Sequence, residues 1–242
     1  MRRIAYAILV AACCWAVAST SAAAKSSHHD NPNRALFAVD AEPFGKSMAT
    51  WGELASQWVY AQPFDRSPLF DPTGANCAVD QHGPVWYIAR IAGPPVFSGT
   101  RHCTIPGEKA LFLYIGAVVD TYPCPPEFNF EPAPGQSLYE FLSADAKAGL
   151  DTVDFLEVSL DGKAVKNVFD YRYASDNLFA IKGDLSLREP LDPCITGDWQ
   201  PAVVDGFFMM FKPLKRGEHI IRVHGTNTIG HDKTFTYFLT IG

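Results

Sequence analysis

The densest group of polar side chains that could do chemistry lies between residues 71 and 102. Asp71, His82 and His102 are of the types that hold a divalent metal ion, and a metal-bound water becomes a nucleophile near neutral pH. However, Asp71-Pro72-Thr73-Gly74 is also a typical turn sequence, in which Asp bonds to nearby backbone amides. The segment therefore allows two interpretations, a metal site or a set of turn residues.

The same segment could bind a ligand without catalysing a reaction. Arg101 and His102 offer charge and hydrogen bonds, and Trp86 offers a ring that could stack on a sugar. Because Trp86 and Tyr87 are neighbours on an expected strand, they point to opposite faces, and at least one is expected in the core. We take His82, Trp86, Arg101 and His102 as candidate ligand-binding residues.

Other candidates are aromatic residues, surface histidines and paired carboxylates. They are Trp199 and the Phe128-Asn129-Phe130 loop for stacking, His219, His224 and His231 with Asp232, and the pairs Glu127 with Glu131 and Asp151 with Asp154. A glycosidase usually takes its two acids from separate strands, so the sequence proximity of these pairs says little. The G-x-S-x-G, H-E-x-x-H and G-x-x-x-x-G-K-[ST] motifs are absent, which excludes the standard forms of three common enzyme designs.

The cysteines predict a disulfide framework around these residues. Cys13 and Cys14 lie in an expected signal peptide. Four cysteines remain in the mature chain, namely Cys77, Cys103, Cys124 and Cys194. An even number without C-x-x-C spacing favours disulfides over a metal site, and four cysteines allow three pairings. We expect Cys77–Cys103 and Cys124–Cys194, because the first pair would close a segment between turns and the second would join two loops.

The sequence pattern predicts strands for most of the chain that positions these residues. We expect strands at Val85–Ala92, Ala110–Val119, Val153–Leu160, Ala164–Asp170, Val203–Phe211, Glu218–His224 and Lys233–Thr240. Asp161-Gly162 predicts a tight hairpin between two of them. The expected fold is mainly β, an immunoglobulin-like or related β-sandwich with two added helices.

The two helices are indicated by periodicity and capping. Apolar residues recur at three- and four-residue steps over 46–60, where Trp51 and Trp58 would face the core or, alternatively, line a ligand groove. Ser137 and Glu140 form a capping box at the start of a helix that should run to about Ala148, with Gly149 as its stop.

The first residues predict export. Arg2 and Arg3 precede an apolar run that ends in Ala22-Ala23-Ala24, as in a cleavable signal peptide over residues 1–24. An alternative is a lipoprotein anchored at Cys13. We expect a flexible segment over 25–43 and a single β-rich domain over 44–242, without a transmembrane segment.

The charge of the chain bears on its partners. Because the signal peptide holds two arginines and no acid, cleavage lowers the formal net charge from −6 to about −8. This acidity argues against nucleic acid as a partner.

Several motifs together carry a resemblance that covers nearly the whole mature chain. They are the helix with two tryptophans and the segments 71–77, 81–86, 101–106 and 107–110. The pattern resembles a family of uncharacterised, signal-peptide-bearing bacterial proteins that are secreted or periplasmic. Because that family has no assigned activity, the resemblance implies export and a single domain, and no chemistry.

The function expected from the sequence is binding of a small molecule or an envelope component by an exported β-sandwich. The alternative is an exported hydrolase of a small ester, lactone or glycan, with a divalent metal as the possible cofactor at Asp71, His82 and His102.

Overall fold

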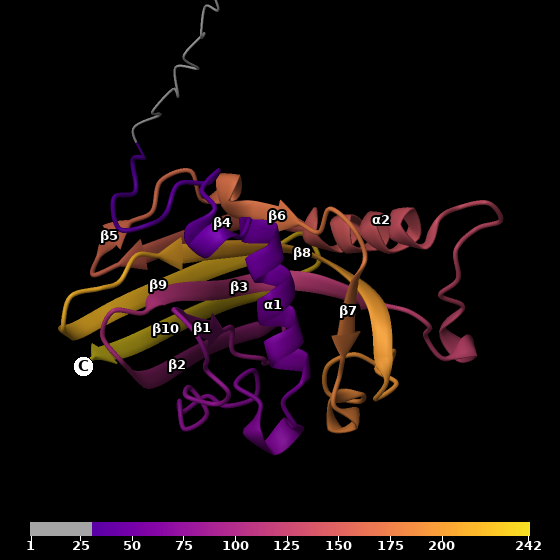
Figure 1. Ribbon diagram of the computed structural model, residues 1–242, viewed down its shortest axis with the longest axis horizontal. Helices are drawn as coiled ribbons and strands as arrows, with labels where there is room; N and C mark the ends of the chain where they lie inside the picture. Colours follow the sequence, from indigo (N-terminus) through magenta and orange to yellow (C-terminus); the bar gives the residue numbers. More distant parts are fainter. Residues whose placement is uncertain (1–30) are drawn as a thin grey trace, which may run out of the picture. The chain divides into compact units, whose positions relative to one another are not determined.

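A computed structural model describes residues 31–242 (Figure 1). The expected signal peptide, the alternative lipid-bearing Cys13 and residues 25–30 lie outside the described residues. Over 31–242, no helix is long and apolar enough to cross a membrane.

The strands form two sheets of five strands each, which confirms the expected mainly β sandwich. In the first sheet the order is β1 (Val85–Ala89), β3 (Ala110–Thr121), β8 (Trp199–Phe211) and β6 (Arg172–Ala174), and β7 (Phe179–Lys182) also pairs with β8. In the second sheet the order is β2 (Val96–Ile105), β10 (Asp232–Ile241), β9 (Gly217–Asn227), β4 (Val153–Leu160) and β5 (Lys163–Ala164). The pairs β1/β3 and β2/β10 are parallel, and the other pairs are antiparallel.

The central strands β3 and β8 are buried on both faces, which explains their long apolar runs. Leu113 and Met209 contribute to the core between the two sheets. Phe112 and Phe208 point the other way, toward α1 (Met48–Tyr60), which crosses in front of these strands in Figure 1. Gly52 lets α1 approach closely, since a Cβ there would lie 2.4 Å from the Phe208 ring.

The second helix, α2 (Leu138–Leu150), begins with the expected capping box at Ser137 and Glu140. Leu142 packs with Val203, whose side chain lies on the face of the first sheet opposite to α1. The expected stop at Gly149 is wrong, because the helix continues two residues beyond Ala148 to Leu150, which is buried in the core between the sheets. Short 3-10 helices lie at Pro43–Gly45, Phe64–Arg66, Pro126–Phe128, Val168–Tyr171 and Leu185–Leu187.

The hairpin at Asp161-Gly162 is confirmed, and both residues have positive φ, at 51° and 75°. The strand expected over 164–170 is wrong, because β5 ends at Ala164 and a 3-10 helix begins at Val168. Strand β2 was not expected. Its inward positions include Gly99 and Arg101, so the alternation that usually reveals a half-buried strand is hidden.

The part of the expected flexible segment that the structure describes is packed on the first sheet. Leu36 is 1% exposed and forms a β-bridge with Phe211. The Phe37 amide donates to the Met210 carbonyl over 2.9 Å. Residues 36 and 37 therefore extend the edge of the core instead of forming a solvated tail.

Both expected disulfides are formed, Cys77–Cys103 and Cys124–Cys194. The first joins the loop before β1 to β2, and the second joins the loop after β3 to the loop before β8. Such bridges are typical of proteins that fold in an oxidising compartment.

Candidate ligand-binding cleft

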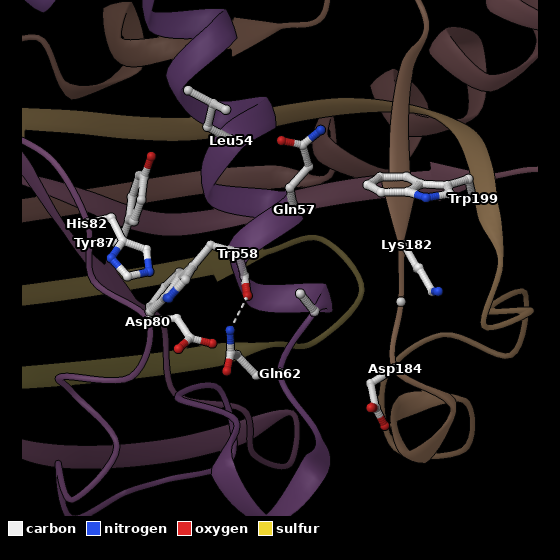
Figure 2. Close-up of a pocket in the computed structure, with 12 residues that line it drawn as sticks. Leu54, Gln57, Trp58, Gln62, Asp80, His82, Tyr87, Lys182, Asp184 and Trp199 are labelled. Carbon is white, nitrogen blue, oxygen red and sulfur yellow. Dashed lines mark hydrogen bonds between the residues drawn. The ribbon is translucent and has the colours of Figure 1, made fainter.

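A cleft of about 640 Å³ lies on the α1 side of the first sheet (Figure 2). One face of α1 supplies Gln57 and Trp58, and the loop before β1 supplies His82 on one side. The end of β7 and the start of β8 supply Lys182 and Trp199 on the other side. Its volume lies within the range of about 300–1,000 Å³ that is usual for small-molecule sites.

Aromatic rings stand on both sides of this cleft. Trp58 stacks on Tyr87, with ring centroids 5.3 Å apart, and its indole Nε1 donates to the Val79 carbonyl over 2.9 Å. Burial raises the pKa of Tyr87 to about 12, so its hydroxyl stays neutral. Across the cleft, Trp199 is 68% exposed, an unusual position for so large an apolar surface. The cleft thus has one fixed aromatic wall and one open aromatic surface.

Polar groups also line this cleft. Gln57 donates through Nε2 to the Ala180 carbonyl over 2.7 Å, and Gln62 donates to the Trp58 carbonyl over 3.2 Å. These bonds fix both amides, and within 31–242 their oxygens accept no hydrogen bond. Asp80, His82 and Lys182 also make no side-chain hydrogen bond to any other described residue. The cleft therefore presents free donors and acceptors of both charge signs.

The loop that carries Asp80 and His82 is held by a residue that sequence reasoning did not single out. Gln81 donates through Nε2 to the Tyr87 carbonyl over 2.9 Å and accepts from the Tyr87 amide over 2.9 Å. Its Nε2 also contacts the carbonyl of Cys77, whose disulfide anchors the start of the loop. A single sequence does not reveal such a pair of amide hydrogen bonds, because a Gln in a turn is usually interpreted as a solvent-exposed residue.

The expected metal ligands do not come together. Asp71 is buried, and its carboxylate accepts from the amides of Thr73, Gly74 and Asn76 over 2.7–3.0 Å. Burial raises the pKa of Asp71, but the hydrogen bond from the Thr73 hydroxyl, over 2.6 Å, and those from these amides outweigh it and hold the pKa below its ordinary value. The turn interpretation is therefore confirmed for Asp71. In the part of the chain that the structure describes, no group of three His, Cys, Asp or Glu side chains could hold a metal ion.

Of the four candidate ligand-binding residues, His82 lines the cleft. Trp86 is 6% exposed in the core between the sheets, and Arg101 is 1% exposed with its guanidinium bonded to backbone carbonyls. His102 lies on the outer face of β2 and stacks on Phe238, with centroids 4.9 Å apart. These three side chains are therefore placed by the strands that carry them, away from the cleft.

Several of the remaining candidates form local links. His219 bonds to Asp161 of the tight hairpin through Nδ1 over 2.8 Å, and His224 bonds to Asp232 over 2.9 Å. Asp151 pairs with Arg172 over 2.7 Å. These contacts connect neighbouring elements of the fold.

A half-buried acid lies apart from the cleft. Asp120 of β3 pairs with Val203, so its side chain lies on the α2 side of the first sheet. Burial first, and then the negative charges of Asp145 and Asp192, raise the pKa of Asp120 to about 7. Its Oδ2 is buried and has no hydrogen-bond partner among the described residues. Asp120 is therefore neutral in mildly acidic solution.

We expect Asp120→Asn to stabilise the fold at high pH. In the unfolded chain this carboxyl ionises near pH 4, whereas in the folded chain it ionises at about pH 7. Stability that the neutral acid contributes is complete below about pH 4 and is lost as the pH rises to about 7. As the pH rises from about 4 to about 8, the free energy of unfolding of the variant should therefore increase by about 1–3 kcal/mol relative to that of the wild type. Urea unfolding of the wild type and the variant at about pH 4 and about pH 8 measures this difference. Asp198→Asn, at an exposed position, is the control. The prediction would be contradicted if Asp120→Asn changed the free energy of unfolding equally at the two pH values.

Comparisons with known proteins add little to this geometry. No protein-family model matches the chain, and no curated protein matches it. One solved structure, titled "Solution Structure of Amebosin", matches 62% of this chain and 100% of its own at 13% identity, with a TM-score of 0.19. A score this low carries no argument about fold or function.

Proposed function

We propose that the protein is an exported binding protein whose cleft takes a carbohydrate or a similar neutral, polyhydroxylated ligand. The observation that carries the proposal is the exposed ring of Trp199, which stands across a 640 Å³ cleft from free polar groups. Export is supported by the two disulfides and by the signal-like first residues.

The chemistry of the cleft matches the chemistry of a sugar. A pyranose ring has apolar C–H faces, which pack on an aromatic ring, and a rim of hydroxyls that both donate and accept hydrogen bonds. Trp199 offers the first kind of contact, and the free amide oxygens of Gln57 and Gln62 with the charged Asp80 and Lys182 offer the second. Since the charges in the cleft have both signs, a neutral ligand fits it better than a strongly charged one.

The alternative of a metal-dependent hydrolase at Asp71, His82 and His102 finds no support in the donor set. The Asp71 carboxylate is occupied by three backbone amides, and His102 stacks on Phe238. We therefore do not propose catalysis at these residues.

The test is calorimetric titration with hexameric cello-, xylo-, chito- and manno-oligosaccharides. The wild type should bind at least one of them. Trp199→Ala should weaken that binding by about 2 kcal/mol, or roughly 30-fold, because the ring supplies the main apolar contact.

The matched control is Phe128→Ala, which removes another exposed ring, 50% exposed, on the loop after β3. This ring is a stacking candidate in the sequence, but it does not line the cleft. It should bind as the wild type does. Failure of the wild type to bind any of these sugars, or unchanged binding by Trp199→Ala, would reject the proposal.

A further inference from the structure

A second cavity, of about 400 Å³, lies inside the sandwich, away from the cleft. Its walls are apolar side chains from both sheets, namely Ile115, Val118, Leu156, Phe207, Val223 and Phe235. Ile229, in the turn between β9 and β10, also lines it and is 67% exposed. The cavity therefore reaches the surface at this turn, where Ile229 lies beside the polar residues Thr226, Asn227 and His231.

The space exists because of small residues at a backbone irregularity. The register between β3 and β8 shifts between Tyr114 and Gly116, and a Cβ placed on Gly116 would meet no atom within 4 Å. Gly225 of β9 also lines the cavity without a side chain. Close packing is the rule in protein interiors, so an open apolar space of this size between two sheets is a feature that a ligand would fill.

Two cations border this apolar space without a neutralising acid. Arg90, which follows β1, and Lys233 of β10 both line it, and none of its lining residues is Asp or Glu. Lys233 donates to the Gly93 carbonyl over 3.0 Å, but over residues 31–242 neither cation forms an ion pair with a carboxylate. Burial lowers the pKa of Lys233, and the charge of Arg90 lowers it further. A ligand anion at this point would relieve the repulsion between them.

We propose that this cavity binds a small amphipathic monoanion, with a single alkyl chain between the sheets and its carboxylate at Arg90 and Lys233. The apolar walls select the chain, and the unpaired cations select the head group. The volume is near the lower end of the usual range for ligand pockets, about 300–1,000 Å³, which suits one alkyl chain of fatty-acid type. This inference is independent of sugar binding in the cleft, because the two cavities share no lining residue.

The test is titration calorimetry with dodecanoate, and with dodecanol as the uncharged analogue, both kept below the concentration at which they form micelles. The wild type should bind dodecanoate saturably at one site and dodecanol at least about tenfold more weakly. The double variant Arg90→Gln/Lys233→Gln should bind the two with equal affinity. Lys215→Gln/Arg216→Gln, an equal change of charge in the exposed turn before β9, should keep the preference.

A filled cavity provides the second arm. Gly116→Leu should abolish binding of both compounds, and circular dichroism shows whether the variant is folded. If it does not fold, the charge variants still decide. No saturable binding of dodecanoate to the wild type, equal affinity of the wild type for dodecanol, or an unchanged preference in the Arg90/Lys233 variant would each overturn the proposal. Trp199→Ala should bind dodecanoate normally, which separates this test from that of the cleft.

Discussion

Replacing Arg101 with Met is expected to lower the free energy of unfolding by about 3–5 kcal/mol. The Arg101 side chain is 1% exposed and donates to the carbonyls of Asp71, over 2.7 and 3.0 Å, of Ala89, over 2.7 Å, and of Pro68. It also lies over the ring of Tyr237, 6.0 Å from the centroid. Met keeps the apolar stem but leaves the carbonyls of Asp71 and Pro68 without a donor, whereas Ala89 still accepts from the Tyr237 hydroxyl over 3.2 Å. A buried polar group left unpaired costs about 1–3 kcal/mol.

The measurement is denaturant unfolding, with two matched variants. Arg222→Met removes an arginine from an exposed position on β9 of the same sheet, and we expect a change within about 0.5 kcal/mol. Arg101→Lys should recover only part of the loss, because an ammonium cannot reproduce the planar fork that reaches three separate carbonyls. A loss below about 1 kcal/mol for Arg101→Met would show that the carbonyls find other partners.

Removing the Cys124–Cys194 disulfide is expected to destabilise the fold by about 4 kcal/mol. The bridge joins residues 70 positions apart, so it restricts the unfolded chain strongly. Part of the local structure should survive in Cys124→Ser/Cys194→Ser, since Gln200 also joins these loops through bonds to the Pro123 and Cys194 carbonyls over 3.0 and 2.9 Å. The variant should therefore fold with lower stability, and not lose its structure.

The Cys77–Cys103 bridge is the internal comparison. This bridge joins residues 26 positions apart, so we expect its removal to destabilise the fold by about 3 kcal/mol. The loss is smaller than for Cys124–Cys194, because that bridge closes a longer loop. Urea unfolding of both double variants measures the order. A thiol reagent should find no free thiol at Cys77, Cys103, Cys124 or Cys194 in the unfolded, non-reduced protein, and four free thiols there would refute both bridges.

The buried Arg101 also shows why the sequence was a poor guide to the site. An Arg beside a His in a polar segment is typical of a ligand-binding loop, yet Arg101 lies on β2, where alternation directs its side chain inward. Its neighbour His102 points outward for the same reason. The Arg101 guanidinium then holds the loop of Pro68 and Asp71, which makes its role structural.

The cleft could be predicted only in fragments. The sequence indicates His82 as a ligand-binding candidate, Trp199 as a stacking candidate, and Trp58 as a residue of the core or of a groove. No spacing in the sequence relates these residues, since they come from a loop, the start of β8 and α1. Only the packing of α1 on the first sheet, with β7 and β8 beside it, brings them to one cavity.

The sequence by itself determined the fold class, the two helices, the Asp161-Gly162 hairpin and the presence of disulfides. These features depend on local periodicity, capping and turn chemistry, or on cysteines with few possible partners. The tertiary structure alone decided the two-sheet order, the parallel pairing of β2 with β10, the inward position of Arg101 and the residues that line each cavity. Those depend on contacts between residues far apart in the chain, which no local pattern encodes.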